Sequence, residues 1–279
     1  MLAHRHALLA LSLAGCIRQP QNDPRRAAPA AQSATRDAST VTAPPAAPSP
    51  PPIVAPTPAE TLRFVTRVTG GAPDDARLPL VIALHGLGDT PEAFIELVTS
   101  MGLRLRVAAP AGINRWGDGY AWFGMRSEMP QARWAEEVRH AAAVVTPEIL
   151  RVATANPTCG LPVVMGFSQG AMLSYAVLAR PGAGVFAALP IAGLLPRELW
   201  PAARDVGGLL PSVTAFHGDA DGRVSLSDDR ATNDAFRAVG FRAELRTYPG
   251  VGHAVPPQVA RDVRAKLVEL MRSQACPVE

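Results

Sequence analysis

The sequence lacks the patterns by which several classes of protein are recognised. It has no His-Glu-x-x-His motif and no closely paired cysteines, and its six histidines are scattered along the chain, so no metal site is predicted. Its glycines form neither a phosphate-binding loop nor a dinucleotide-binding fingerprint. Aromatic residues make up only 5% of the chain, and the net charge of +3 comes from scattered arginines without a basic block. We therefore expect no cofactor and no binding to nucleic acid.

Internal repeats are also absent, and charge is low, with 18% charged against 48% hydrophobic residues. This balance is typical of a globular protein with a sizeable core. Residues 60–279 are enough for one α/β domain and leave little room for a second. We therefore expect a single folded domain over this range.

The first residues are typical of an export signal. Residues 4–6 give a basic start, and the apolar run Ala7–Ala14 that follows is too short to span a bilayer. Next comes Leu-Ala-Gly-Cys, which resembles the bacterial lipobox, where cleavage leaves the cysteine, here Cys16, as a lipid-modified N-terminus. We expect residues 1–16 to be a lipoprotein signal segment and the protein to be lipid-anchored in a bacterial cell envelope, outside the cytoplasm. A secretory signal with an incidental cysteine is the alternative.

A stretch rich in proline and alanine follows. Residues 17–59, and Pro44–Pro58 above all, offer almost nothing to bury and many positions without a backbone donor. This composition favours extended, unfolded chain. We expect a disordered tether that holds the folded domain away from the membrane, with a proline-rich recognition segment as the alternative.

Short apolar runs alternate with helical patterns over the rest of the chain. Strands are expected at Leu62–Val68, Leu80–Leu84, Leu105–Ala109, Val163–Phe167, Phe186–Ile191, Val213–Phe216 and Ala243–Tyr248, and helices at Pro91–Ser100, Trp134–Ala153, Gln169–Ala179, Ser227–Val239 and Pro257–Arg272. The first strand alternates in polarity, as an antiparallel strand does, whereas several others are apolar throughout, as strands with helices on both faces are. The sequence predicts a doubly wound, mostly parallel sheet whose site lies at the carboxyl ends of its strands.

The most informative motif is Gly166–Gly170, which reads Gly-Phe-Ser-Gln-Gly and follows the apolar run Leu161–Met165. A serine hydrolase needs such a serine at the end of a buried strand. The flanking glycines are expected to let the backbone turn sharply into a helix, which lifts the hydroxyl clear of its neighbours. The following helix then points backbone N–H groups at the place where an oxyanion forms. Ser168 is therefore the expected nucleophile.

A base and an acid for this serine follow in the order Ser…Asp…His. His253 lies in a glycine-rich loop after the last expected strand, where it can reach a cleft, and it is the expected base. Asp219 and Asp221 both follow another expected strand, and either can orient the histidine. His85 and His217 lie within the ends of strands and are poorer candidates for the base.

Four short motifs occur at the ends of expected strands, namely His85-Gly86-Leu87-Gly88-Asp89, Gly166-Phe167-Ser168-Gln169-Gly170, His217-Gly218-Asp219-Ala220-Asp221 and Gly252-His253. Together they resemble the phospholipase/carboxylesterase family of α/β-hydrolases, which includes acyl-protein thioesterases and small bacterial carboxylesterases. The resemblance extends over residues 60–275 and implies an α/β-hydrolase fold.

The resemblance also implies roles for individual residues. Of the two aspartates, Asp221 is favoured as the acid that orients the histidine. The backbone N–H groups of Gln169 and Leu87 are expected to form the oxyanion hole, with Gly88 in place of Leu87 if the loop is shifted by one residue. The two strand-end histidines are expected to help shape the loops and not to carry protons.

The chain departs from the family pattern after the acid. The family usually continues with a small hydrophobic stretch and a proline, whereas residues 222–225 here read Gly-Arg-Val-Ser. The segment Gly193–Pro211, where many relatives carry a lid, is short, so we expect no large lid and an open site. These departures leave the expected triad intact and bear on the substrate.

Aromatic residues, rare elsewhere, gather in the segment Trp116–Met125 after an expected strand end. Trp116, Trp122 and Phe123 are therefore expected to line an acyl or alcohol pocket. Packing of this loop onto the core is the alternative.

Two cysteines remain once Cys16 is assigned to lipidation. Outside the cytoplasm a disulfide between Cys159 and Cys276 is permitted. Two unpaired, partly buried thiols are the alternative, and the sequence leaves both open.

These patterns predict a serine esterase that cleaves carboxylic esters of small to medium acyl chains through an acyl-enzyme, with Ser168, His253 and Asp221 as its triad. A thioesterase or lysophospholipase with the same triad is an alternative. A further alternative, from a different class, is a surface lipoprotein that binds ligands on a hydrolase fold without turnover.

Overall fold

The computed structural model describes residues 62–202 and 211–276. The expected signal segment, Cys16 and the tether lie outside the described residues, as does the stretch 203–210 within the segment for which no large lid is expected. No helix in the described ranges has the length and apolar character needed to cross a membrane.

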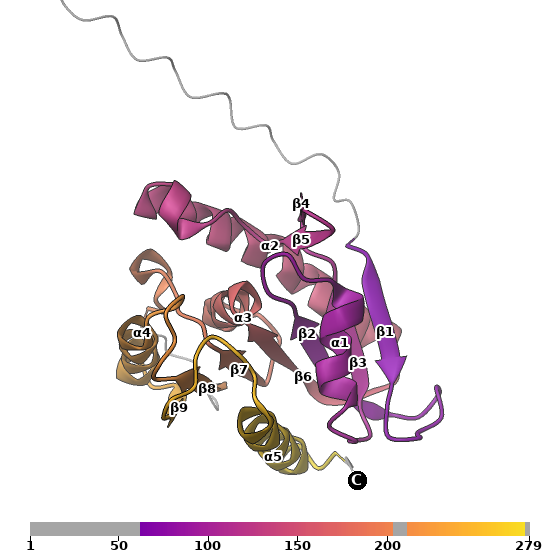
Figure 1. The fold of residues 1–279 in the computed structure, drawn as a ribbon. Helices are drawn as coiled ribbons and strands as arrows, with labels where there is room; N and C mark the ends of the chain where they lie inside the picture. Colours follow the sequence, from indigo (N-terminus) through magenta and orange to yellow (C-terminus); the bar gives the residue numbers. More distant parts are fainter. Residues whose placement is uncertain (1–61, 203–210, 277–279) are drawn as a thin grey trace, which may run out of the picture. The chain divides into compact units, whose positions relative to one another are not determined.

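Seven strands form one sheet in the order β1-β3-β2-β6-β7-β8-β9 (Figure 1). Their bounds are Phe64–Val68 for β1, Leu78–Leu84 for β2, Arg106–Pro110 for β3, Thr158–Phe167 for β6, Ala187–Ile191 for β7, Ser212–Gly218 for β8 and Arg242–Tyr248 for β9. Strand β1 runs antiparallel to β3, and the other neighbouring strands run parallel. The predicted mostly parallel sheet with an antiparallel first strand is confirmed.

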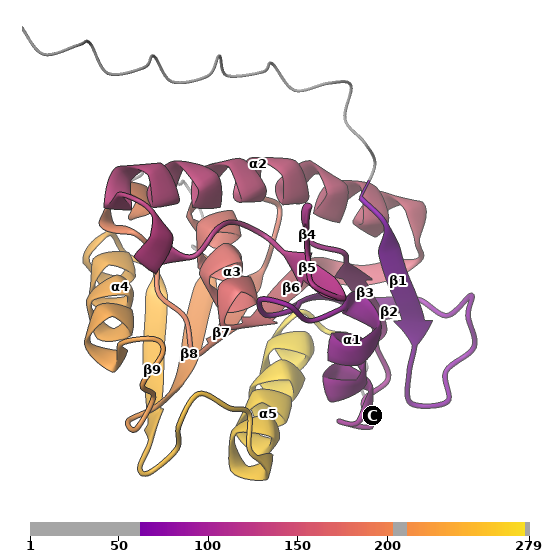
Figure 2. The same cartoon turned by 45° about the horizontal axis from the view of Figure 1, so that its top comes forward.

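Helices cover both faces of this sheet (Figure 2). They are α1 (Pro91–Thr99), α2 (Gln131–Ala155), α3 (Gln169–Ala179), α4 (Leu226–Ala238) and α5 (Pro257–Ser273). Side chains of α2, α3 and α4 pack in one apolar cluster with Leu80, Ile82 and Leu84 of β2. Those of α1 and α5 pack in a second cluster with Val81 and Ala83 of the same strand. Alternate residues of β2 thus enter opposite cores, which explains why it is apolar throughout.

The expected elements are present, with shifted ends, and one hairpin is added. Helix α3 has the predicted bounds, whereas α2 begins at Gln131 and β6 begins at Thr158, five residues before the strand expected from Val163. A small antiparallel hairpin, β4 (Asn114–Trp116) and β5 (Gly119–Ala121), was not predicted. Strands of three residues are too short to show a period in the sequence.

A disulfide joins Cys159, near the start of β6, to Cys276, just past α5, with 5.8 Å between their Cα atoms. The sequence left this pairing open, because the approach of two residues 117 positions apart depends on the whole fold. The bridge lies at the amino end of β6, whereas the serine motif follows its carboxyl end.

Candidate active site

Ser168 forms the sharp turn between β6 and α3. It is one of the few non-glycine residues with a positive φ, at +56°, and its ψ is −116°. Its backbone N–H donates to the carbonyl of Ile191 at the end of β7 (3.0 Å), and its own carbonyl accepts from Met172 in α3 (3.1 Å). This backbone conformation costs a non-glycine residue about 1–3 kcal/mol. The packed strand and helix on either side hold the serine there.

The glycines on either side of Ser168 let the chain turn sharply, as expected, because they lack a Cβ. Neither Gly166 nor Gly170 has a positive φ, so their contribution is space and not an unusual backbone conformation. A Cβ on Gly170 would lie 1.9 Å from the carbonyl oxygen of Leu84, and a Cβ on Gly166 would lie 2.3 Å from Gly170 itself. Both glycines are required because backbones approach closely here. Ser168 adopts the unusual backbone conformation of the turn, and the two glycines make room for it.

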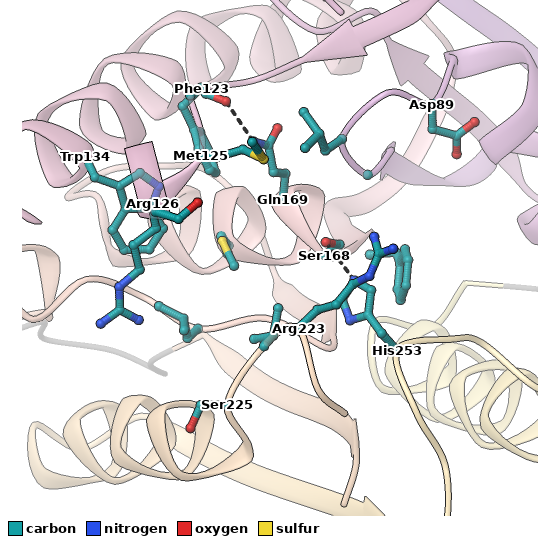
Figure 3. Close-up of a pocket in the computed structure, with 18 residues that line it drawn as sticks. Asp89, Phe123, Met125, Arg126, Trp134, Ser168, Gln169, Arg223, Ser225 and His253 are labelled. Atoms are coloured by element: carbon teal, nitrogen blue, oxygen red, sulfur yellow. Dashed lines mark hydrogen bonds between the residues drawn. The ribbon is translucent and has the colours of Figure 1, made fainter. Parts of the chain in front are cut away.

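His253 and Asp221 form a chain of hydrogen bonds with this serine, and Figure 3 shows the bond between Ser168 and His253. The Ser168 hydroxyl lies 3.0 Å from Nε2 of His253, and Nδ1 of the ring lies 2.7 Å from Oδ2 of Asp221. The carboxylate comes from the loop after β8 and the histidine from the loop after β9. The three side chains, each predicted at a strand end, meet at the carboxyl edge of the sheet.

The carboxylate of Asp221 is held in its ionised form. Its side chain is wholly buried, and burial alone would raise its pKa. The N–H groups of Val224 (3.0 Å) and Arg223 (2.8 Å) donate to Oδ1, and His253 binds Oδ2. Together these hydrogen bonds outweigh burial and hold the pKa of Asp221 below its ordinary value. An ionised carboxylate in this position favours the Nδ1–H tautomer of the histidine, which leaves Nε2 free to accept a proton.

Asp219, the alternative acid, has a different position. Its Oδ1 accepts from the backbone N–H of Gly250 at 2.7 Å and so ties the loop after β8 to the loop after β9. The structure therefore brings Asp221, and not Asp219, to the histidine.

Leu87, in the loop after β2, and Gln169, the first residue of α3, line the cavity with Ser168. The backbone N–H groups of both have no acceptor in the described part of the chain. The N–H of Gly88, the alternative donor, does not face an oxyanion, because it donates to the carbonyl of Tyr120 at 2.8 Å. The geometry therefore favours Leu87 and Gln169 as the pair that can hold an oxyanion.

His85 braces the loop that carries Leu87. Its Nε2 accepts from the N–H of Gly112 (3.0 Å), so Nδ1 carries the proton and donates to the carbonyl of Gly86 (2.7 Å). Burial lowers the pKa of His85 and keeps the ring neutral. The ring stacks on Trp122, with centroids 4.9 Å apart. This histidine shapes the loop and is not placed to take a proton from the serine.

The aromatic segment divides between core and cavity. Phe123 lines the cavity, whereas Trp122 is fully buried and donates its indole N–H to the carbonyl of His85 (2.9 Å). Trp116 is 40% exposed on the β4–β5 hairpin and is not among the residues that line the cavity. The side chain of Gln169 binds the backbone of Trp122 (3.0 Å) and of Phe123 (2.7 Å) and fixes this segment against α3. Of the three expected pocket residues, the structure brings only Phe123 to the cavity.

The cavity in front of Ser168 has a volume of about 730 Å³. Much of its lining is apolar, with a wall formed by Phe123, Met125, Trp134, Met172, Leu194 and Val224. Most of this wall was not predicted from the sequence, because its members come from five separate segments and carry no local signature. A wall of this kind suits the hydrocarbon part of an acyl group.

A buried polar cluster, which was not predicted from the sequence, lies behind Asp221. His217 Nδ1 binds Asp229 (2.6 Å), and Nε2 lies 3.0 Å from the carbonyl of Val224 and 3.4 Å from Asp221. Burial lowers the pKa of His217, but the bond to Asp229 outweighs it, so that the pKa is raised.

The same cluster continues into α3 and α4. The other oxygen of Asp229 accepts from the hydroxyl of Tyr175 (2.5 Å) and from Asn233 (3.1 Å). Asp229 lies in the first turn of α4 and is fully buried. Acidic residues are common at helix starts, so the local sequence does not indicate this buried role.

The sheet is mostly parallel, and its strand β6 is followed by a serine that has a positive φ and is hydrogen-bonded to a histidine. This arrangement defines an α/β-hydrolase. The family model described as phospholipase/carboxylesterase matches residues 71–270, and the chain belongs to this family. Family and fold place it among the serine ester hydrolases.

Individual relatives agree with this placement. The chain is 29% identical over 102 residues to acyl-protein thioesterase 1 of Debaryomyces hansenii, a match that covers 36% of this chain and 44%, less than half, of the relative. It is 26% identical over 195 residues to a probable carboxylesterase of Oryza sativa subsp. japonica, covering 63% of this chain and 71% of the relative.

Solved structures show the same fold. Esterase PE8 superimposes with a TM-score of 0.63 at 22% identity, over 75% of this chain and 99% of that one. Acyl-protein thioesterase 2 of Zea mays superimposes with a TM-score of 0.58 at 22% identity, over the same shares of the two chains.

Proposed function

We propose that this protein hydrolyses carboxylic esters through an acyl-enzyme formed on Ser168. The observation that carries the proposal is the chain of hydrogen bonds from Ser168 through His253 to Asp221, which opens onto a cavity with an apolar wall. No cofactor is required, because a nucleophile, a base and an oxyanion hole suffice for acyl transfer.

The proton moves through His253 in both half-reactions. As Oγ of Ser168 attacks the ester carbonyl, Nε2 takes the hydroxyl proton, and Asp221 stabilises the imidazolium through Nδ1–H. The N–H groups of Leu87 and Gln169 hold the negative charge on the carbonyl oxygen. The imidazolium then gives its proton to the leaving alkoxide. A water molecule repeats the sequence on the acyl-enzyme and releases the acid.

Small to medium acyl chains are the proposed substrates. The volume of about 730 Å³ and the apolar wall beside Ser168 support this choice. Thioester hydrolysis is the second candidate, and the thioesterase names among the relatives favour it. The two activities need the same triad and differ only in the leaving atom.

A position in the cell envelope, with the lipid anchor at Cys16, is also part of the proposal. Its support is the lipobox-like Leu-Ala-Gly-Cys at residues 13–16. The Cys159–Cys276 disulfide supports it as well, because such bonds persist mainly outside the cytoplasm.

Hydrolysis of p-nitrophenyl esters with acyl chains of increasing length tests the activity, with Ser168→Ala as the matched control. We expect turnover of short and medium chains by the native chain and none above background by the variant. An alkylphosphonate probe should label the native chain alone. A folded native chain that neither turns over any ester nor reacts with the probe would indicate a binding protein instead.

Metabolic labelling with a fatty-acid analogue tests the anchor. The native chain should carry the label and sediment with membranes, and Cys16→Ala should lose the label and become soluble. Equal labelling of both chains would show that Cys16 is not the modified residue.

A further inference from the structure

Arg223 is a charged residue at the cavity that has no partner in the part of the chain that the structure describes. It lines the cavity together with Ser168 and His253 and is exposed to it. Among the described residues no carboxylate and no carbonyl accepts from its guanidinium. Arg126, the other arginine of the lining, differs because it is paired with Asp228 at 3.1 Å. Of the two arginines among the described residues that line the cavity, Arg223 therefore carries the unpaired positive charge.

The backbone at Arg223 is fixed by the triad itself. Its N–H and that of Val224 both donate to Oδ1 of Asp221, so the loop after the acid is held as a tight turn. The side chain therefore starts two residues from the acid. Figure 3 shows it extending past His253 with its guanidinium toward Ser168. This is the position where the family pattern usually continues with hydrophobic residues and proline, and here it carries a cation.

The guanidinium of Arg223 lies on a different side of the nucleophile from the side chains of Phe123, Met125 and Trp134. In Figure 3 the labelled Phe123, Met125 and Trp134 lie on one side of Ser168, while Arg223 lies on the side of His253. An acyl chain fits the side of these three apolar residues. The leaving oxygen receives its proton from His253, so the alcohol part of the ester lies on the same side of the cavity as this histidine.

Of the described residues that line the cavity, Asp89 is the one carboxylate. Its Oδ1 accepts from the N–H of Thr90 at 2.8 Å, and Figure 3 places it on the loop after β2, away from Arg223. No lining carboxylate therefore competes with a bound anion for the guanidinium of Arg223.

We propose that Arg223 determines specificity by binding an oxyanion, a carboxylate or a phosphate, on the leaving alcohol of the ester. The inference rests on the proposed esterase function and adds the substrate class. A guanidinium offers paired N–H donors in a plane that matches both groups. The preferred substrate is then an ester with a neutral acyl chain and an anionic alcohol.

Two matched pairs of acetyl esters test this inference on the native full chain. The first pair is 4-nitrophenyl acetate and 3-carboxy-4-nitrophenyl acetate. The second is 1-acetylglycerol and 1-acetylglycerol 3-phosphate, followed by release of acetate. For each pair the measured quantity is the ratio of kcat/KM for the anionic ester to that for the neutral one, corrected for the rates of hydrolysis by hydroxide. Within a pair the acyl group is constant, so the ratio reports the alcohol side alone.

The variants are Arg223→Gln, Arg223→Lys and the control Arg230→Gln. Arg230 is an exposed arginine of α4 outside the cavity, so the control removes the same charge from the molecule. We expect Arg223→Gln to lower the ratio about tenfold for at least one pair, the size expected of a solvent-exposed, charge-assisted hydrogen bond. The loss should come from KM, should shrink at high salt, and should be partly restored by lysine.

The pair that responds identifies the oxyanion as carboxylate or phosphate. Equal ratios in the native chain and in Arg223→Gln for both pairs, with both neutral esters hydrolysed, would overturn the role of Arg223 and leave the esterase intact. An equal fall in Arg230→Gln would show that only the net charge matters. Absence of any Ser168-dependent hydrolysis by the native chain would instead overturn the proposed function, and this inference with it.

Discussion

Reduction of the Cys159–Cys276 disulfide should destabilise the fold strongly and leave the chemistry of the site unchanged. The bond closes a loop of 117 residues. The chain-entropy relation for a loop of this length gives about 5 kcal/mol at 25 °C. Typical domains unfold at a cost of about 5–15 kcal/mol, so the bond accounts for a large part of the stability. The serine follows the opposite end of β6, so kcat/KM per folded molecule should stay the same.

Denaturant unfolding of the native chain, oxidised and reduced, measures this contribution. Alkylation of the two thiols confirms that reduction is complete. The double variant Cys159→Ser/Cys276→Ser is the control, because its unfolding must not respond to the reductant. Cys276 is buried, so the variant adds the cost of a buried hydroxyl, and the reduced native chain gives the cleaner value. A loss of less than about 1 kcal/mol on complete reduction would refute the loop-closure reasoning.

Four further changes test the site. Ser168→Gly should be about 1–2 kcal/mol more stable to denaturant than Ser168→Ala, because both lack the hydroxyl and only glycine accepts φ +56° without strain; equal midpoints would show that the turn is unstrained. Gly170→Ala should lower Tm sharply or prevent folding, because its Cβ would lie 1.9 Å from a carbonyl oxygen of β2. Asp221→Asn should lower kcat by on the order of 10³–10⁴ with little effect on KM, and a variant with native kcat would show that the histidine needs no acid. The pKa of His217 is higher in the folded protein than the value of about 6.5 in the unfolded chain, so its pairing with Asp229 stabilises the fold fully at pH values below 6.5. This contribution is lost as pH rises through the folded pKa, and Asp229→Asn should flatten the resulting decline in the free energy of unfolding.

The ends of parallel strands were predictable from the sequence. Apolar runs followed by Gly-Phe-Ser, His-Gly-Asp and Gly-His mark the carboxyl ends of β6, β8 and β9, and parallel strands bring such ends to one edge. That topology is why Ser168, His253 and the pair Asp219 and Asp221 could be predicted from the sequence to meet. The choice between Asp219 and Asp221 needed the resemblance to a family, because both residues lie in the same loop.

Side-chain direction and burial were not predictable in the same way. Trp122 was expected in the pocket, but its indole N–H donates to a buried carbonyl and its ring stacks on His85, so it belongs to the core. Tyr175 lies in α3 and Asp229 in α4, and neither helix has a sequence pattern that indicates a buried polar contact. Their contact with His217 exists only once α3 and α4 pack on the same face of the sheet.

Around the serine, most backbone groups of the loop after β2 are already engaged in hydrogen bonds with neighbouring residues. In the loop after β2 the N–H of Gly88 is bound by a carbonyl of the hairpin, and the carbonyls of residues 85 and 86 are bound by Trp122 and by the ring of His85. Among the described residues the N–H of Leu87 has no acceptor, and the bonds on either side hold it in place. The side chain of Gln169 likewise fixes the first turn of α3, while its backbone N–H has no acceptor in the same part of the chain. An oxyanion that forms beside these two donors needs no rearrangement of the protein, and donors fixed before the reaction stabilise charge most effectively.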